Sequence, residues 1–110
     1  MIHGTHNALA DSRNESVLIY INDELLPRED ATISVFDSGY LVGDGVWEGI
    51  RLHHGVLCFI NDHLDRLWEG AASIGMKLPF SREELIATIR KTLDANKMED
   101  ELHVRGMVTR

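Results

Sequence analysis

The sequence predicts an α+β domain with a mainly antiparallel sheet and two helices on one face. Segments rich in β-branched and aromatic residues, separated by turn residues, occupy much of residues 17–60 and return at residues 102–109. Between residues 60 and 93, apolar residues instead repeat with helical spacing. Strands followed by helices are typical of α+β domains, and 110 residues provide one modest core.

The first part of the chain predicts an arm and three short strands. Residues 1–16 have no apolar periodicity, so we expect a flexible N-terminal arm. Residues 17–21 predict a strand, and residues 25–26 begin a return strand that Pro27 ends or confines to an edge. We expect a further short strand at residues 32–36.

The middle of the chain predicts a hairpin, and the end predicts one more strand. Residues 46–52 and 56–60 read as two strands joined by a turn at His53, His54 and Gly55. Residues 102–109 read as the last strand.

Two helices are predicted between these strands. The first carries its apolar residues on one face from Ile60 to Ile74, with Asn61 or Asp62 as N-cap and Gly75 as the stop. Ser81 and Glu84 have the spacing of a capping box that opens the second helix.

Composition excludes several classes of function. The net charge of −7, from 11 basic and 18 acidic residues, argues against a nucleic-acid partner. No apolar run approaches the ~20 residues of a membrane helix, so no membrane partner is expected. Cys58 is the only cysteine and cannot form an intrachain disulfide. No His-x-x-x-His pair lies on a predicted helix, so no metal site is expected. These features predict a soluble cytoplasmic protein.

Two motifs carry the functional signal: GDGVWEGIR at residues 43–51 and HLDRL at residues 63–67. Together with a capped helix beginning SREEL, they resemble the N-terminal domain of the class IV, or fold-type IV, pyridoxal-phosphate enzymes. This family includes branched-chain and D-amino-acid aminotransferases and aminodeoxychorismate lyase. The resemblance covers residues 17–110 and implies pyridoxal phosphate as cofactor, an amino acid and a 2-oxo acid as substrates, and a homodimer as the complete protein.

The resemblance also implies roles for three residues. Arg66 of HLDRL matches the arginine that contacts the cofactor phosphate, and a planar fork of donors suits a phosphate. Trp47 matches an aromatic position that walls the substrate side chain, although a core tryptophan is the alternative. Arg105 matches an arginine near the substrate carboxylate. His103 and Val42 stand where branched-chain members have tyrosines, which weakens an assignment to branched-chain substrates.

The chain lacks a counterpart of the family's Schiff-base lysine, so we expect no catalytic residue within it. Its three lysines are Lys77, Lys91 and Lys97, and none has a sequence setting that would desolvate an amine. We therefore expect residues 17–110 to be the N-terminal domain of an aminotransferase whose lysine domain lies outside this chain, inactive on its own. The alternatives are an aminodeoxychorismate lyase or a non-catalytic α+β binding or scaffold domain derived from the fold.

Overall fold

The computed structural model describes residues 10–110, which divide into two compact units, residues 10–31 and Thr32–Arg110. Of the arm expected at residues 1–16, residues 1–9 lie outside the described part. Within the rest of that segment, Ser12–Asn14 form a single 3-10 turn, η1, capped by the side chain of Asp11.

The first unit is built around a hairpin of two antiparallel strands, β1 (Leu18–Ile21) and β2 (Glu24–Pro27). Asn22 and Asp23 both have left-handed backbone angles, with φ of 48° and 71°, and they form the two-residue turn between the strands. A second 3-10 turn, η2 (Arg28–Asp30), follows directly. The two strands expected here are confirmed, and they form a separate two-stranded sheet.

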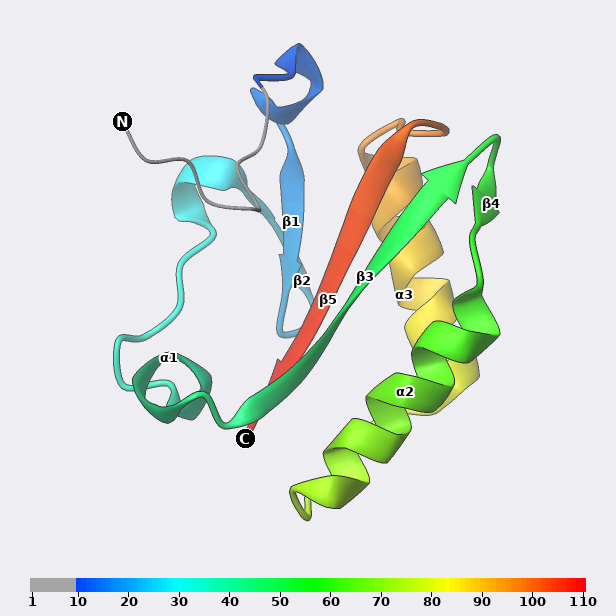
Figure 1. The fold of residues 1–110 in the computed structure, drawn as a ribbon. Coiled ribbons are helices and arrows are strands. Elements are labelled where there is room, and N and C mark those ends of the chain that lie inside the picture. The colour runs from blue at the N-terminus through cyan, green and yellow to red at the C-terminus, as the bar shows by residue number, and fades with distance from the viewer. Residues whose placement is uncertain (1–9) are drawn as a thin grey trace, which may run out of the picture. The chain divides into compact units, whose positions relative to one another are not determined.

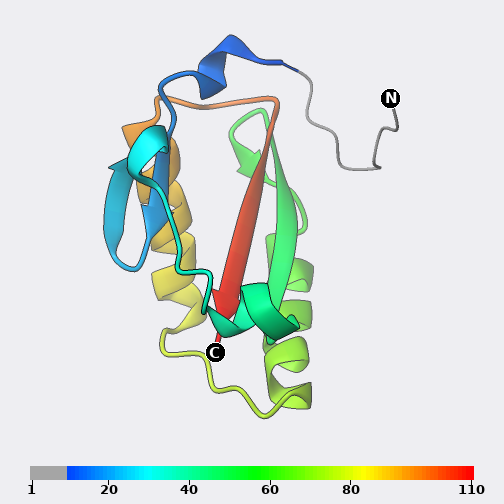
Figure 2. The same cartoon turned by 90° about the vertical axis from the view of Figure 1, so that its left-hand side faces the viewer.

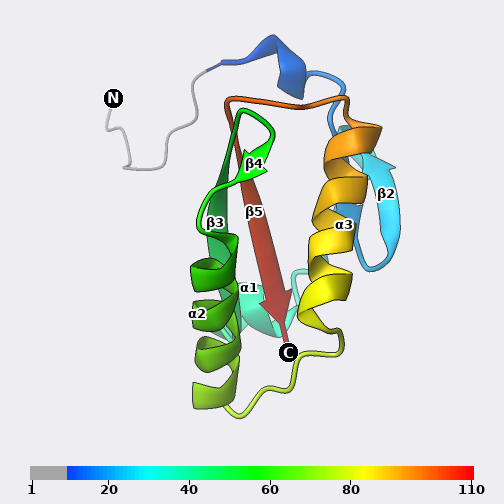
Figure 3. The ribbon, with the colours of Figure 1, turned by 90° about the vertical axis from the view of Figure 1, so that its right-hand side faces the viewer.

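The second unit is a three-stranded antiparallel sheet in the order β4-β3-β5, with two long helices on one face (Figures 1 and 3). The central strand β3 (Gly45–His53) pairs along most of its length with β5 (Leu102–Thr109). It pairs with β4 (Val56–Leu57) only at its end. The helices are α2 (Ile60–Ser73) and α3 (Arg82–Ala95). This arrangement confirms the predicted α+β class.

The core fills the space between this sheet and the two helices. In one cluster, Ile50 and Leu52 of β3 and Leu57 of β4 pack against α3, through Ile89 and Leu93. A second cluster joins α2 to the segment between the helices, and its members are Leu67, Ala71, Met76 and Leu78. Burial of these side chains fixes which face of β3 points to the helices.

Both helix starts can be compared with the sequence. The capping box at the start of α3 is present as predicted, with Ser81 and Glu84 each bonding the other's backbone. The predicted N-cap of α2 at Asn61 or Asp62 is wrong, because the N-cap is Phe59. Phe59 has a left-handed backbone (φ 54°) that turns the chain from β4 directly into the helix, which also shortens the strand expected at residues 56–60.

The strand expected at residues 32–36 is wrong. The segment pairs with no other strand in the described part of the chain, and a backbone bond from Asp37 to Ser34 bends it. Its apolar side chains remain exposed, so no buried face favours an extended strand. A short helix that the sequence analysis did not predict, α1 (Ser38–Val42), follows at once.

The turn between β3 and β4 forms as the sequence predicts. His54 and Gly55 have φ of 47° and 75° and lie between the paired residues His53 and Val56. Among residues 10–110, no helix has both the length and the apolar character needed to cross a bilayer.

Candidate functional site

Strand β3 presents two different chemical surfaces because neighbouring side chains on a strand point to opposite faces. Glu48 and Ile50 face the helices and are buried. Trp47 faces the other way and is 48% exposed. Figure 2 shows this second face, where β3 and β5 lie in front of α2 and α3. Trp47 and Glu48 are neighbours in one motif, but their side chains lie in different environments.

On the open face, Trp47 and Arg105 are brought together. The guanidinium carbon of Arg105 lies 4.3 Å from the centre of the Trp47 ring, within the range of a cation–π contact. The register explains this: Trp47 stands opposite Met107, and Gly49 stands opposite Arg105. Because Gly49 has no side chain, the space beside Arg105 is left to the indole ring. Two of the three residues expected to line a site thus form one surface.

Arg66 lies on the other face, in α2, where it is paired with Glu48. Its Nε donates to Glu48 Oε2 at 2.8 Å, and its Nη2 donates to Oε1 at 2.7 Å. His63, one turn earlier in α2, places Nδ1 2.7 Å from the same Oε1. Glu48 is only 5% exposed. Glu48 is therefore the partner of both Arg66 and His63.

The Glu48 carboxyl is held in its charged form. The bidentate bonds from the Arg66 guanidinium lower the pKa of Glu48 below its usual 4.5, with a further contribution from His63 and against the opposing effect of burial. The same pairing raises the pKa of Arg66. Since a carboxylate can only accept hydrogen bonds, Nδ1 of His63 carries the proton that it shares with Glu48.

This pairing gives a pH prediction. A carboxyl whose pKa is lowered on folding stabilises the fold above its unfolded value near 4.5, and this contribution is lost as the pH falls through the folded value. Wild type should therefore be more stable than Glu48→Gln at pH 7 by about 1–3 kcal/mol. Urea unfolding at pH 7 and at progressively lower pH below 4.5 should show the difference shrinking. A difference independent of pH would contradict the assignment.

The second edge of the Arg66 guanidinium, formed by Nη1 and Nη2, faces away from Glu48. The Arg66 side chain is 72% exposed, and Nη1 has no hydrogen-bond partner among residues 10–110. The Nη1–Nη2 edge can therefore receive two oxygens of a phosphate while the Nε–Nη2 edge stays on Glu48. This donor set fits the phosphate of pyridoxal phosphate.

The turn that contains Gly43 and Gly45, called the glycine turn here, separates α1 from β3 and fixes where β3 begins. Gly43 ends α1 in the left-handed region (φ 70°). A Cβ atom on Gly45 would lie 2.7 Å from the Val108 carbonyl oxygen, so only glycine allows β5 to approach there. Asp37 caps α1 through Gly39 and accepts a bond from Thr109, which connects α1 to the end of β5.

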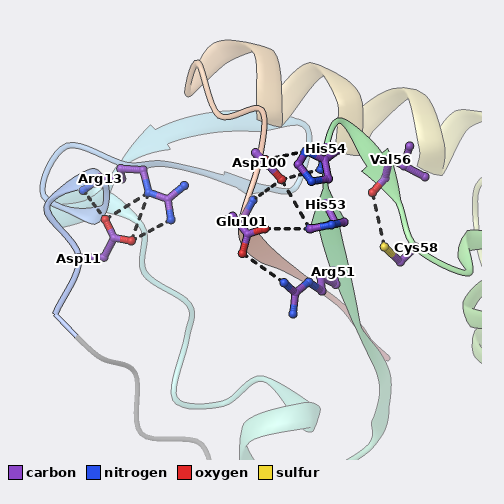
Figure 4. Close-up of polar contacts among 9 residues, drawn as sticks. All are labelled: Asp11, Arg13, Arg51, His53, His54, Val56, Cys58, Asp100 and Glu101. Atoms are coloured by element: carbon purple, nitrogen blue, oxygen red, sulfur yellow. Dashed lines mark hydrogen bonds and ion pairs between the residues drawn. The ribbon is translucent and has the colours of Figure 1, made fainter.

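A polar cluster gathers at the opposite end of the sheet, where the β3–β4 turn meets the start of β5 (Figure 4). His53 and Arg51 both reach Glu101, and Asp100 accepts from the backbone N–H of His54. Ligand atoms of His53, Asp100 and Glu101 lie within 4.8 Å of one another. No metal site is expected from the sequence. These bonds form a hydrogen-bonded clasp that closes this end of the sheet.

The three lysines offer little as a covalent anchor. Lys77, Lys91 and Lys97 are all exposed, so water solvates each amine. A Schiff-base lysine is usually activated by desolvation or by a neighbouring cation.

Sequence reasoning missed Glu48 and His63 as members of the site. Both lie within the two motifs, three residues or fewer from a predicted site residue. The available signal was an acidic residue on the apolar face of a strand, since a buried carboxylate requires a cationic partner.

Comparison with known proteins identifies the family of the chain. The family model described as amino-transferase class IV matches residues 45–110. A putative branched-chain-amino-acid aminotransferase of Methanocaldococcus jannaschii is 42% identical over 92 residues, which are 84% of this chain and 32% of that protein. A D-alanine aminotransferase of Listeria monocytogenes is 42% identical over 80 residues, covering 73% of this chain and 28% of that protein.

Solved structures show the same relationship. The branched-chain aminotransferase of the archaeon Thermoproteus uzoniensis superposes with a TM-score of 0.75 at 29% identity, over 84% of this chain and 32% of that chain. The T.th. branched-chain enzyme, complexed with N-(5'-phosphopyridoxyl)-L-glutamate, gives a TM-score of 0.74 at 27% identity, over 84% and 33%. The chain thus spans about a third of the length of these relatives. Family model, relatives and fold agree, and the chain belongs to the class IV amino-transferases.

Proposed function

We propose that residues 17–110 are the N-terminal domain of a pyridoxal-phosphate-dependent aminotransferase that moves an amino group between an amino acid and a 2-oxo acid. The donor is a branched-chain-like or a D-amino acid, as the names of the relatives suggest. The observation that carries the proposal is that the outer edge of the Arg66 guanidinium is exposed while Glu48 holds its inner edge. Both residues lie within the two motifs that resemble the family. "Full-length protein" below means this chain together with the lysine-bearing domain that we propose lies outside it.

Each site residue has a defined task in this proposal. Arg66 binds the cofactor phosphate through its outer edge, and Arg105 binds the substrate carboxylate on the open face of the sheet. Trp47 walls the substrate side chain beside Arg105. The bound cofactor supplies the withdrawal of electrons from the amino acid, and the protein binds and orients it.

Arg66 lies on the helix side of β3, whereas Trp47 and Arg105 lie on its other side. A ligand that contacts both sides must therefore lie across an edge of the strand. β4 pairs only with Leu52 and His53, and the backbone N–H of Cys58 donates to the carbonyl of Arg51. Within the described residues, the edge of β3 from Gly45 to Gly49 therefore has no neighbouring strand on that side. A ligand at this edge would have Arg66 on one side and Trp47 on the other.

A covalent trapping experiment tests the division of labour between the two domains. Borohydride reduction of the full-length protein with pyridoxal phosphate, followed by peptide mapping, should place the adduct on a lysine outside residues 1–110. The exposed Lys77, Lys91 and Lys97 should remain unmodified at stoichiometric cofactor. A stoichiometric adduct on any of these three would show that the chain contains its own anchor and would contradict the proposal.

The size of Trp47 should select among amino donors. Trp47→Phe keeps an aromatic wall and opens volume, and a pocket change of this scale is worth about 1–3 kcal/mol in discrimination. In the full-length protein, kcat/KM for larger donors should rise relative to alanine, with cofactor affinity little altered. Met107→Leu, which conserves volume opposite Trp47, is the control and should leave the ratio unchanged. A common fall for all donors would instead assign Trp47 to a structural role.

We also propose that the full-length protein is a cytoplasmic homodimer. Six apolar side chains in one short segment are each more than half exposed, and exposed apolar side chains that cluster in this way often mark an interface. They are Ile33, Val35, Phe36, Tyr40, Leu41 and Val42. Sedimentation velocity should give twice the monomer mass, and a monomer at micromolar concentration would refute the dimer. The single cysteine is compatible with a reducing compartment.

A further inference from the structure

Glu48 is the one charged side chain that is buried in the described part of the chain. It projects from β3 toward α2, where Arg66 and His63 lie one turn apart on the same side of the helix. Both carboxylate oxygens are occupied: Oε2 by Arg66 Nε, and Oε1 by Arg66 Nη2 and His63 Nδ1. Placing a carboxylate here costs desolvation energy that a leucine would not incur.

The three bonds have a clear effect on Arg66. An exposed arginine without a fixed partner samples many rotamers, and ordering it on binding a ligand costs conformational entropy. The bidentate pair with Glu48 fixes both the position and the plane of the guanidinium before any ligand arrives. His63 in turn bonds one Glu48 oxygen and restricts the rotation of the carboxylate.

We propose that Glu48 and His63 are positioning residues that orient Arg66 toward a phosphate. This inference rests on the proposed function, in which Arg66 binds the cofactor phosphate. Glu48 does not touch the cofactor, because both of its oxygens are already bonded within the protein. Its role is to hold the Nε–Nη2 edge so that the Nη1–Nη2 edge faces outward, and His63 maintains Glu48 in that orientation.

Glu48 also has a second effect on phosphate affinity, which opposes the first. Its negative charge lies next to Arg66 and disfavours a phosphate, so removing the charge alone would tighten phosphate binding. Two variants separate the effects. Glu48→Gln keeps the shape and removes the charge, while its amide N–H₂ faces the Arg66 donors and breaks the bidentate pair. Glu48→Asp keeps the charge but is one methylene too short to reach both donors.

The experiment compares two ligands in the full-length protein. Dissociation constants are measured for pyridoxal phosphate and for pyridoxal, which lacks the phosphate, so their ratio isolates the phosphate contribution. If Glu48 positions Arg66, Glu48→Gln and Glu48→Asp should both weaken pyridoxal phosphate by about threefold to tenfold relative to pyridoxal. Asp65→Asn is the matched control: Asp65 also lies on α2 and pairs with an arginine, Arg82, and its removal should leave the ratio unchanged.

Two further measurements test whether the effect passes through Arg66. In an Arg66→Ala background, Glu48→Gln should produce no additional change in the ratio, because the residues act as one unit. His63→Ala should lower the phosphate preference, and His63→Asn should restore it, since the asparagine amide nitrogen occupies the place of Nδ1. A residue with only a structural role would change both ligands equally.

The outcomes separate this inference from the proposed function. If Arg66→Ala weakens pyridoxal phosphate selectively but the Glu48 variants change both ligands alike, the positioning role is wrong and the phosphate role of Arg66 stands. If Glu48→Gln tightens pyridoxal phosphate and Glu48→Asp has no effect, charge alone governs binding and the inference is again overturned. If Arg66→Ala leaves the ratio unchanged, the proposed phosphate site itself fails.

Discussion

Arg66→Ala in the full-length protein should weaken binding of pyridoxal phosphate by about tenfold to a hundredfold, because two charge-assisted hydrogen bonds to the phosphate are lost. Absorbance titration of the cofactor into apo-protein measures this directly. Binding of pyridoxal should change much less, since that ligand has no phosphate to lose contact with.

The pairing with Glu48 adds a cost that must be controlled. Arg66→Ala also leaves a buried carboxylate without its main partner, so the variant loses stability as well as affinity. Arg66→Lys retains a cation near Glu48 but lacks the planar fork, and it should regain stability more fully than affinity. Arg82→Ala removes the same charge from an exposed ion pair with Asp65 and should leave the cofactor affinity unchanged. Unaltered affinity with a lowered melting temperature for Arg66→Ala would identify Arg66 as a packing residue.

Leu52→Ala should reduce the stability of the sheet by about 2–5 kcal/mol. Leu52 is 1% exposed and lies in the core cluster shared by β3, β4 and α3, so truncation leaves a cavity that the surrounding strands cannot close. Native-state hydrogen exchange of the amides in β3 and β5 reports on this unit, whatever else the full-length protein contains.

Val56, in the same β3–β4 hairpin as Leu52, supplies a matched control. Val56 is 60% exposed on β4, and Val56→Ala removes apolar atoms from the same region without opening a cavity. Its effect should lie within about 0.5 kcal/mol. Equal losses for Leu52→Ala and Val56→Ala would mean that the cluster around β3 is not the core of the unit.

The sequence was sufficient for elements whose signals are local. β5 matches its predicted residues 102–109, and the α3 capping box is present, because alternation and cap chemistry act within a few residues. The helix α1 also had local signals, Asp37 as N-cap and Gly43 as C-cap, but five residues are too few to show helical periodicity. Residues 32–36 misled for the opposite reason, since β-branched residues favour a strand only when a partner covers them.

The site required information that the sequence does not display. Trp47 and Arg105 are far apart in the chain and meet only because β3 and β5 pair in one particular register. The bond between Glu48 and Arg66 likewise depends on which face of β3 packs against α2. The resemblance named Arg66, Trp47 and Arg105, but it did not reveal that the first lies on the opposite face of the sheet from the other two.

The opposed directions of Trp47 and Glu48 make the site sensitive to the length of the chain before β3 as well as to its chemistry. Deleting one residue between Gly43 and Val46 would shift the phase of β3 and exchange its two faces, carrying Glu48 out to solvent and the indole under the helices. Lengthening the loop at residues 75–80, which lies between the helices, would not change that phase. A deletion in the glycine turn is therefore expected to disrupt the site through the phase of β3, whereas a longer loop between the helices is expected to act only through the packing of Met76 and Leu78.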